Sequence, residues 1–457
     1  MTTYNESVLA AAEKVARAAQ RDFFNIRDEG AVTLSAIAGA GKSYFVMDTV
    51  KQCRRREMRV AVAAPTNEQV FSLVRSIADN EPREPVVFIP AKDVELPPWA
   101  QRPNIRMVTP AHQASGQAVV VGTIDKLASA RNPRKRQIPP IGRFDALIMD
   151  ESFQANAGRY FGIADVAPRH LCVGDRGQIH PFTTVEAGTQ WRGLSEDPLQ
   201  TAVDVLHANH PTTPAHRFPI TRRLDGRGAV IAKCFYPSDH IFGAAVADGV
   251  REMKLGRAMA CNRCDRALDE GLSLAAKNGW AYLELPARQT LVCDPETAQV
   301  IVDLVARLRA RTPRLICERH PKGTDLVAGR IAIGVSHNDQ KAMIGALLER
   351  AGLGGVVVDT ANKLQGREFD FSICWHPMAG LNEADEFHLE SGRMCVMCTR
   401  HRHACIVVGR AGDRELVEGL PPSTPAWPGA ESDDILRGWE VHQSIFSALM
   451  PYHVQVL

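Results

Sequence analysis

Short apolar runs alternate with amphipathic stretches along most of the first half of the chain. The apolar runs predict buried strands, and the stretches that follow several of them have the 3.6-residue period of a helix. The predicted strands are 31–37, 59–64, 118–122, 146–149 and 170–173, and the predicted helices are 6–24, 42–52 and 68–77. Residues 79–116 are Pro-rich and irregular apart from the apolar run 86–89, and could hold a small inserted element. Strands that alternate with helices in this way indicate an α/β domain with a parallel sheet.

The second half of the chain repeats this alternation. Asp294 and Pro295 predict a helix start, because Asp caps free N–H groups and Pro fits the first turn. Further strands are predicted at 330–335, 356–358, 369–375 and 404–409, and helices after 336–340 and over 391–402. A last helix, 432–449, has an apolar face, for which core packing is the first interpretation and a partner-binding surface the second.

The regular pattern breaks at residues 207–214, which are rich in Pro, His and Thr and predict a linker. A second Pro-rich linker is predicted at 421–428. We therefore predict two α/β domains with parallel sheets, 1–208 and 209–457, with small or no accessory insertions.

Composition places the chain among ordinary globular proteins. Hydrophobic residues make up 45% and charged residues 23% of the 457 residues, which argues against extensive disorder. The formal net charge of +2 does not exclude nucleic acid, because positive charge can concentrate in one groove. No apolar run approaches the roughly 18 residues that span a bilayer, and no signal segment is visible, so we expect a cytoplasmic protein without a membrane partner. The 11 scattered cysteines suit reduced core thiols.

Residues 34–43 read Leu-Ser-Ala-Ile-Ala-Gly-Ala-Gly-Lys-Ser, a run of small residues directly after an apolar strand. We predict a phosphate-binding loop whose backbone N–H groups face one point, with the positive end of a following helix beside it. The loop backbone that would surround the phosphates is that of Gly39, Ala40 and Gly41. Lys42 would contact the β- and γ-phosphates, and Ser43 would hold Mg²⁺. Because Ala36 replaces the usual first glycine, a Gly-rich turn without a ligand is the alternative.

Two acidic residues, Asp150 and Glu151, follow an apolar strand at its carboxyl end, where ligands of open parallel sheets bind. Asp150 can hold Mg²⁺, generally through water, and Glu151 can polarise the water that attacks the γ-phosphate. An apolar strand followed by Asp-Glu is common by chance. The prediction therefore depends on the distance of Asp150 and Glu151 from Lys42, which is typical of one nucleotide-binding domain. Gln178, which closes the turn after the next strand, could sense the γ-phosphate.

Three other clusters have a simpler interpretation. The basic run 131–136 is more typical of a solvated loop than of a phosphate contact. The Cys-x-x-Cys pairs 261–264 and 395–398 could together imitate a zinc site, but core packing explains the second pair. A linker is favoured over a metal site for three histidines without regularly spaced partners, namely His207, His210 and His216.

An ordered set of motifs resembles the superfamily 1 helicases over roughly residues 15–410. The motifs are A-I-A-G-A-G-K-S at 36–43, A-P-T-N at 64–67, D-E-S-F-Q at 150–154, G-D-R-G-Q at 174–178, Q-G-R-E at 365–368 and C-T-R-H at 398–401. The D-E-x-x-Q, S-H-N-D-Q and V-D-T-A-N-K-L-Q-G-R-E-F-D segments look like the branch that contains the nonsense-mediated-decay RNA helicase. The T-R-H segment is similar to helicases of positive-strand RNA viruses.

The resemblance implies two RecA-like domains of the P-loop NTPase class that clamp one ATP, with Mg²⁺, and bind a single strand of nucleic acid. In the first domain it implies that Lys42 and Ser43 hold phosphate and Mg²⁺, that Asp150 also holds Mg²⁺, and that Glu151 positions the attacking water. Three further roles are implied. Gln178 would couple the γ-phosphate to closure of the two domains, Gln20 would read the adenine edge, and Glu368 would face the nucleotide. Arg400 would act as the arginine finger.

The resemblance also implies contacts to phosphate groups elsewhere. The family's further arginine falls at Arg222 or Arg223. If Arg223 contacts phosphate, Arg222 replaces the aromatic residue that stacks on the base. Contacts to the backbone of the single strand are implied for residues at strand ends, namely Pro65, Thr66, Thr123 and Thr360. Such contacts fix register without reading base sequence.

We therefore expect an ATP-dependent helicase or translocase on single-stranded DNA or RNA, with 5′ to 3′ polarity suggested by resemblance alone. The alternative is a nucleotide-dependent switch or loading factor that acts on a protein partner without unwinding. The lack of a sizeable accessory domain slightly favours this alternative. A kinase that uses the same phosphate loop gives no account of residues 365–368 or of Arg400.

Overall fold

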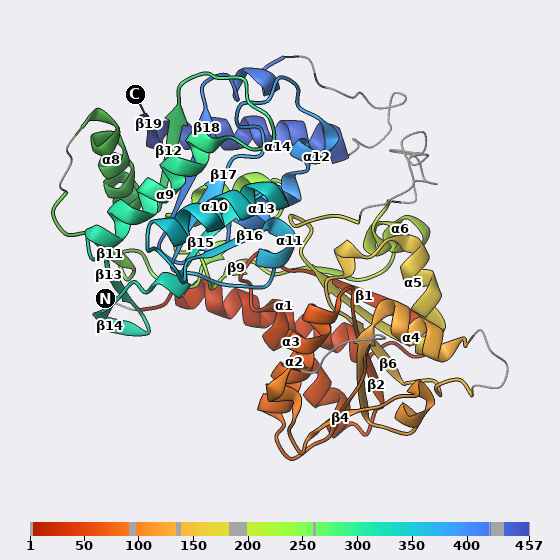
Figure 1. Ribbon diagram of the computed structural model, residues 1–457. Helices are drawn as coiled ribbons and strands as arrows, with labels where there is room; N and C mark the ends of the chain where they lie inside the picture. The colour runs from red at the N-terminus through yellow and green to blue at the C-terminus, as the bar shows by residue number, and fades with distance from the viewer. Residues whose placement is uncertain are drawn as a thin grey trace. The chain divides into compact units, whose positions relative to one another are not determined.

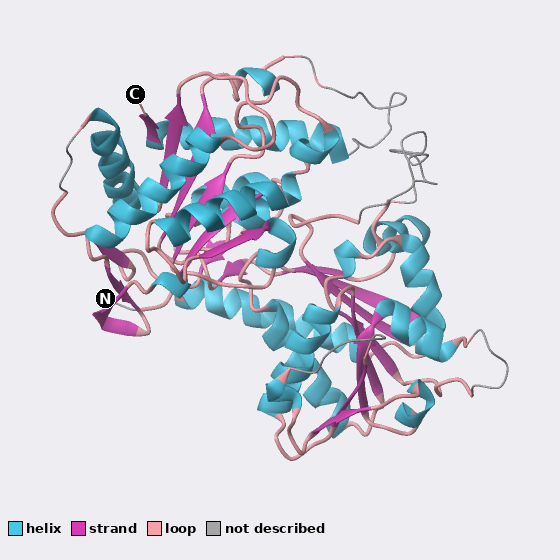
Figure 2. Ribbon diagram, in the orientation of Figure 1, coloured by secondary structure: helices cyan, strands magenta, loops and turns pink. Residues whose placement is uncertain are grey.

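The computed structural model describes residues 3–90, 97–133, 139–181, 199–258, 262–419, 421 and 434–456. These residues form two units, each built around a parallel sheet (Figures 1 and 2). The phosphate-loop unit consists of Ala10–Arg176 and His180–Phe218, and the C-terminal unit of Met1–Leu9, Gly177–Ile179 and Pro219–Leu457. The predicted α/β class with two RecA-like domains is confirmed.

Eight strands form the sheet of the phosphate-loop unit, in the order β4-β3-β5-β2-β6-β7-β1-β8, and all neighbours are parallel. The strands are β1 (Gly30–Ser35), β2 (Val60–Ala64), β3 (Val86–Ile89), β4 (Ile105–Met107), β5 (Val119–Thr123), β6 (Ala146–Met149), β7 (Arg169–Gly174) and β8 (Ala215–Arg217). β2, β5 and β6 are buried along their whole length, which explains why their sequences are continuous apolar runs. Parallel pairing brings the residues that follow these strands to one edge of the sheet.

Six helices in the described part of the chain belong wholly or largely to this unit: α1 (Glu6–Phe24), α2 (Lys42–Arg55), α3 (Asn67–Asn80), α4 (Ile124–Arg131), α5 (Ala157–Ile163) and α6 (Ala202–Asn209). Four of them begin in the same way, because a Thr or Asn side chain accepts a backbone N–H of the first turn. The capping residues are Thr66, Thr123, Asn156 and Thr201.

The stretch that predicted a linker at 207–214 is instead part of this unit. α6 continues through His207, whose Nε2 lies 2.9 Å from Thr33 Oγ1 of β1. β8 then pairs with β1, and His216 Nε2 lies 3.0 Å from Asp22 Oδ2 of α1. The linker interpretation is wrong here because long-range hydrogen bonds order a polar segment whose local pattern is irregular.

The main sheet of the C-terminal unit has six parallel strands in the order β16-β15-β17-β18-β12-β19. They are β12 (Trp280–Leu285), β15 (Ile331–Val335), β16 (Val357–Thr360), β17 (Phe371–Trp375), β18 (Ala404–Arg410) and β19 (His453–Gln455). Two small sheets accompany it, a parallel pair and an antiparallel set of three. Their strands are β9 (Ile220–Thr221) with β10 (Gly243–Ala244), and β11 (Glu252–Lys254) with β13 (Arg314–Cys317) and β14 (His320–Asp325).

The helices of the C-terminal unit are α7 (Ala229–Ala232), α8 (Arg263–Asn278), α9 (Pro295–Ala310), α10 (Asn338–Arg350), α11 (Ala361–Leu364), α12 (Glu386–Leu389), α13 (Ser391–Cys398) and α14 (Asp434–Leu449). α9 begins as predicted, and Asp294 Oδ1 accepts the Glu296 N–H at 3.1 Å. α14 packs on α12 and α13 with Ile445 and Phe446 buried, which confirms its role in the core. α13 ends at Cys398, earlier than predicted, so Arg400 lies in the turn before β18.

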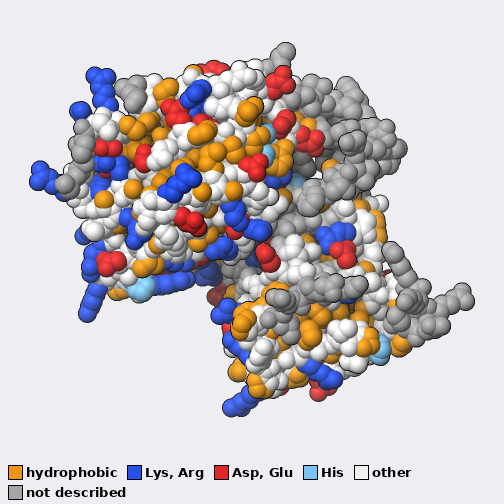
Figure 3. Space-filling view, in the orientation of Figure 1, with side chains coloured by type: hydrophobic (Ala, Val, Ile, Leu, Met, Phe, Trp, Pro, Cys, Tyr) orange, Lys and Arg blue, Asp and Glu red, His pale blue; other side chains and the backbone are white. Residues whose placement is uncertain are grey.

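The surface of the C-terminal unit carries charges of both signs. On the face shown in Figure 3, Lys and Arg side chains lie among Asp and Glu side chains and apolar ones. This mixture agrees with the small net charge of +2. The overall charge therefore does not indicate whether the partner is a nucleic acid, and that evidence has to come from the residues of the site.

Several predicted features fall wholly or partly outside the described residues, namely the basic run 131–136, the linker 421–428, Ser432 and Cys261. Within the described ranges, every helix is too short or too polar to cross a bilayer. The same ranges hold no group of three metal-ligating side chains. Cys395 and Cys398 are buried in α13.

Candidate active site

The phosphate loop connects β1 to α2 in the phosphate-loop unit. Gly39 and Gly41 have φ angles of 75° and 93°, values that glycine adopts at little cost, and the chain turns sharply at both. α2 begins at Lys42, directly after the turn, and its first turn contains Ser43. Ala36 and Ala40 are buried, which leaves the loop backbone as the polar surface near the helix start. This is the strand, turn and helix that the sequence predicts.

The Lys42 side chain lies against the two acidic residues that follow β6. Its Nζ contacts Glu151 Oε1 and lies 3.9 Å from Asp150 Oδ1. The side chain of Lys42 is 14% exposed, that of Glu151 10% and that of Asp150 8%. Asp150 Oδ1 also accepts the backbone N–H of Glu151 at 3.0 Å. The structure therefore brings Lys42, Asp150 and Glu151 together from two segments far apart in the sequence.

Burial and the neighbouring charges together set the pKa values of Lys42 and Asp150. Burial lowers the pKa of Lys42, but the carboxylates of Glu151, Asp150 and Asp175 outweigh burial and leave that pKa raised. The Lys42 ammonium therefore stays charged at neutral pH. Burial raises the pKa of Asp150; Lys42 opposes this shift and Glu151 adds to it.

Glu151 has an unusual backbone conformation. Its φ of 53° and ψ of 39° lie in the left-handed region, which residues with a Cβ rarely adopt. Such a residue costs on the order of 1–3 kcal/mol, and these residues concentrate at functional sites. The strained backbone thus marks Glu151 as a candidate functional residue independently of its motif.

The residues around Lys42 include oxygen ligands of the kind that Mg²⁺ prefers. Ser43 supplies a hydroxyl in the first turn of α2, and Asp150 supplies a buried carboxylate. Mg²⁺ usually takes only one or two such groups from a protein and fills its other positions with water and substrate phosphate. Because burial raises the pKa of Asp150, a neighbouring cation would stabilise its ionised form. These residues fit a magnesium ion that arrives with a nucleotide.

Gln20 lies beside α2, the helix that follows the phosphate loop. Its Nε2 donates to Asp48 Oδ2 at 2.7 Å and to Thr49 Oγ1 at 3.2 Å, and the residue is 8% exposed. The amide nitrogen is therefore fixed by the helix itself. An adenine contact through this residue stays a prediction.

Three of the strand-end residues implied as nucleic-acid contacts lie together in the phosphate-loop unit. Thr123 ends β5 and is the register partner of Ala64, which directly precedes Pro65 and Thr66. Thr66 Oγ1 accepts the Gln69 N–H, and Thr123 Oγ1 accepts the Lys126 N–H. Both hydroxyls therefore also cap helices. In the C-terminal unit, Thr360 ends β16 and precedes α11 without a side-chain cap bond.

Gln178 groups with the C-terminal unit, where two motif residues meet. Its Oε1 accepts a hydrogen bond from Gln365 Nε2 at 2.9 Å. Its backbone also packs directly against Gly392 of α13, since a Cβ at 392 would lie 2.6 Å from Gln178 C and O. Gln178 is thus joined both to Gln365 and to the helix that leads to Arg400.

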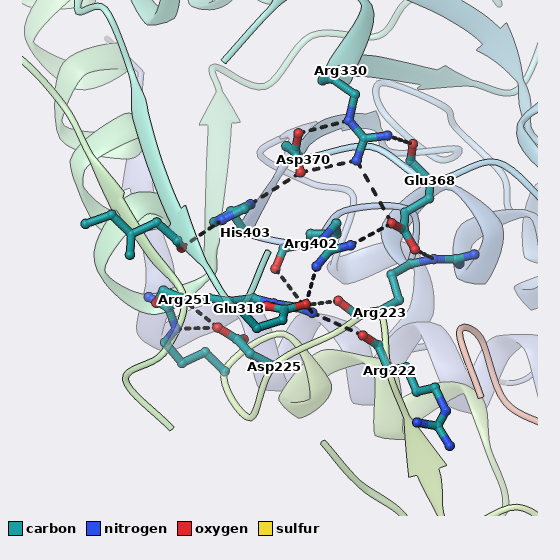
Figure 4. Close-up of polar contacts among 12 residues, drawn as sticks. Arg222, Arg223, Asp225, Arg251, Glu318, Arg330, Glu368, Asp370, Arg402 and His403 are labelled. Atoms are coloured by element: carbon teal, nitrogen blue, oxygen red, sulfur yellow. Dashed lines mark hydrogen bonds and ion pairs between the residues drawn. The ribbon is translucent and has the colours of Figure 1, made fainter. Parts of the chain in front are cut away.

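Arg223, Glu368 and Arg400 also lie close together in the C-terminal unit. Arg223 Nη1 donates to the carbonyl oxygen of Thr399 at 3.0 Å, and its Nε lies 3.6 Å from Glu368 Oε2. Arg400 is 1% exposed, and its Nε donates to Val396 O at 2.9 Å. Arg222 is exposed and turns away from this group (Figure 4). Burial would raise the pKa of Glu368, but Arg223 and Arg402 hold it below its ordinary value.

Two family models match parts of the chain. A model described as "Type III restriction enzyme, res subunit" matches residues 3–174, and a model described as "AAA domain" matches residues 283–412. The two models match different parts of the chain, and neither match covers half of it. They support an NTP-hydrolysing enzyme. No curated protein matches the chain.

The chain also resembles solved structures. A complex of the Arterivirus nonstructural protein 10 (helicase) with DNA has 12% identity and a TM-score of 0.41, over 88% of this chain and 64% of that chain. The ATP-dependent Type ISP restriction-modification enzyme LlaBIII bound to DNA has 10% identity and a TM-score of 0.44, over 95% of this chain and 29% of that chain. The chain thus spans less than two thirds of the length of either protein.

The structure adds charged residues that sequence reasoning missed. Figure 4 shows Arg223, Arg330 and Arg402 around Glu368. Arg402 Nη1 donates to Glu368 Oε1 at 3.0 Å, and Arg330 Nη1 donates to the carbonyl oxygen of Glu368 at 2.8 Å. Arg402 follows the C-T-R-H motif directly, so the motif pointed to its neighbourhood. No local pattern signals Arg330, which comes immediately before β15.

Proposed function

We propose that this protein is an ATP-dependent helicase or translocase that acts on single-stranded nucleic acid. The observation that carries the proposal is the buried cluster of Lys42, Asp150 and Glu151 next to the phosphate loop. The loop geometry supplies backbone N–H groups and a helix N-terminus for phosphate, and Lys42 supplies a cation. The family matches support the same class of enzyme.

In this proposal each residue of the cluster has a separate task. Lys42 binds the β- and γ-phosphates, and it leaves Glu151 when it does so. The released Glu151 carboxylate then orients and polarises the attacking water. Ser43 and Asp150 hold Mg²⁺, which neutralises charge on the phosphates when it is bound. Gln20 contacts the adenine through the part of its amide that α2 does not occupy.

The C-terminal unit would contribute cations to the same reaction. Arg400 would act as the arginine finger, with Arg223 as a second phosphate contact and Glu368 beside it. The burial of Arg223 between Glu368 and Thr399, with Arg222 exposed, favours Arg223 over Arg222 for phosphate. Gln178 would relay the state of the γ-phosphate, since it contacts Gln365 and α13.

The single strand is proposed to contact the carboxyl-end residues Pro65, Thr66, Thr123 and Thr360. The threonine hydroxyls suit phosphate oxygens, whereas Pro65 has no N–H and the N–H groups of Thr66 and Thr360 already donate to Gln69 Oε1 and Asp359 Oδ1. Because such contacts read no bases, binding should tolerate many sequences and depend on salt.

ATP hydrolysis measured with and without single-stranded DNA or RNA tests the proposal. We expect at least one polymer to stimulate hydrolysis, and Lys42→Ala to abolish it. Stimulation by a protein partner and by neither polymer would instead support a nucleotide-dependent switch. A duplex with a single-stranded tail then separates a helicase, which unwinds it, from a translocase, which does not.

A further inference from the structure

A buried ion pair in the C-terminal unit joins two segments that are distant in sequence. Arg251 precedes β11, and Glu318 occupies the turn between β13 and β14. Arg251 Nε donates to Glu318 Oε2 at 3.0 Å, and Arg251 Nη2 donates to Oε1 at 2.8 Å. The side chains are 0% and 6% exposed. Two parallel bonds of this kind fix the guanidinium and carboxylate in one relative orientation.

The remaining donors of Arg251 bind the backbone of the segments that carry the candidate phosphate-binding arginines. Nη2 donates to the carbonyl oxygen of Arg222 at 3.1 Å, and Nη1 donates to that of Arg223. Nη1 also donates to the carbonyl oxygen of Arg402 at 3.3 Å. One guanidinium therefore fixes the backbone of the 222–223 segment against the segment that follows Arg400 (Figure 4).

Glu318 extends this arrangement through its second partner. Its Oε1 accepts a bond from Arg402 Nη2, and the other end of Arg402 binds Glu368. Burial would raise the pKa of Glu318, but bonding to Arg251 and the charges of Arg251 and Arg402 lower it to about 2. Glu318 is therefore a carboxylate throughout the neutral range.

We propose that Arg251 and Glu318 are a positioning pair that sets the placement of Arg223 and Arg400 for phosphoryl transfer. The inference rests on the proposed function, because it assumes that these two arginines contact the nucleotide. Neither member of the pair touches the nucleotide. Each acts through backbone carbonyls or through Arg402. Arg251 bonds the backbone of the 222–223 segment and of Arg402, which lies two residues after Arg400. Glu318 bonds the side chain of Arg402, which in turn bonds Glu368.

A matched control exists in the same unit. Arg307 of α9 and Asp269 of α8 also form a two-bond ion pair, with side chains 16% and 6% exposed. This pair joins two helices and contacts none of the segments 222–223, 399–402 or 368. Asp269→Asn therefore removes a comparable buried charge without disturbing the candidate arginines.

The test compares Glu318→Gln with Asp269→Asn in nucleic-acid-stimulated hydrolysis by the full chain. For Glu318→Gln we expect kcat to fall by about 10²-fold, the loss typical of a small misplacement of catalytic groups. KM and the affinity for a fluorescent ATP analogue should change little. The ratio of affinities for ADP with aluminium fluoride, which mimics the transferred phosphoryl group, and for ADP alone should fall with kcat. Asp269→Asn should lower thermal stability and leave kcat and this ratio near wild type.

Equal effects of the two variants on kcat, in proportion to their loss of thermal stability, would overturn the proposal. If Glu318→Gln does not fold, Glu318→Asp provides the test, because it keeps the charge and shortens the reach. That variant should retain more activity than Arg251→Lys, which loses the fork that holds the carbonyl oxygens.

Absence of hydrolysis by the wild-type chain would contradict the proposed function and this inference with it. Normal wild-type hydrolysis with an unaffected Glu318→Gln would contradict the inference alone.

Discussion

Lys42 and Glu151 form a buried ion pair within the phosphate-loop unit, between the start of α2 and the turn after β6. The pair places a carboxylate next to the lysine that phosphate would engage. Glu151 also has a left-handed backbone conformation that few residues with a Cβ adopt. This unusual conformation at the end of a buried strand supports the proposed role of Glu151 in hydrolysis.

Glu151→Gln should therefore separate binding from turnover. Glutamine keeps the shape and an oxygen for Lys42, but it cannot polarise water as a carboxylate does. We expect hydrolysis to fall by about 10²- to 10⁴-fold, the usual contribution of a general base. Affinity for a fluorescent ATP analogue should stay within a few-fold of wild type. Hydrolysis at the wild-type rate would exclude Glu151 as the base.

Arg400→Ala should abolish turnover and leave ATP binding largely intact. A finger of this kind typically contributes about 10³ to 10⁵ in rate, because it stabilises charge on the transferred phosphoryl group. Steady-state hydrolysis and nucleotide titration give the two measurements. Arg309→Ala, at an exposed position in the last turn of α9, is the control. Wild-type turnover by Arg400→Ala would show that the finger assignment is wrong.

Thr360→Val offers the clearest test of the nucleic-acid contacts. Thr66 and Thr123 also cap helices, so their substitution would change stability as well as binding. Thr360 has no such cap bond. We expect weaker binding of a single strand with an unchanged slope of affinity against salt, because a threonine hydroxyl can bond a phosphate oxygen but neutralises no phosphate charge. Thr212→Val, at an exposed position in the loop before β8, should bind like wild type. Equal binding by Thr360→Val and Thr212→Val would remove Thr360 from the interface.

Asp294→Ala should destabilise the C-terminal unit. Asp294 caps α9 and accepts bonds from Arg410 Nε and Nη2 at 2.8 and 2.6 Å, and both side chains are almost completely buried. Removing one partner of a buried pair costs up to about 3–5 kcal/mol, because the other charge stays buried. Here Glu296 Oε2, which accepts from Arg410 Nη2 at 2.6 Å, still compensates part of that charge. Denaturant unfolding of this variant and of exposed Asp325→Ala measures the difference. A loss no larger than that of Asp325→Ala would contradict this account.

The same residue predicts how stability changes with pH. Burial raises the pKa of Asp294, but bonds from Thr297 and Arg410 outweigh it and leave that pKa below the ordinary value. Its contribution should be complete above about pH 4, the ordinary Asp pKa, and should be lost as pH falls below it. The gap in unfolding free energy between wild type and Asp294→Ala should therefore narrow in acid.

Local signals in the sequence predicted the parts of the fold that depend on neighbouring residues. The strands at 146–149 and 170–173, the turn at Gly39 and Gly41, and the start of α9 are of this kind. The antiparallel strand His320–Asp325 was missed because it has no apolar alternation and is held by pairing with β13. The Arg251–Glu318 pair was missed because 67 residues separate its members. No pattern within a short window reports such a contact.

Gly392 makes the position of Gln178 sensitive to a single methyl group. The shortest possible side chain at 392 would overlap the main chain of residues 178 and 179, where no flexible group can yield. Alanine at this position would act as a steric spacer that leaves every ionisable group in the protein unchanged. It would therefore test whether the proposed coupling of Gln178 to α13 depends on tight backbone contact rather than on charge.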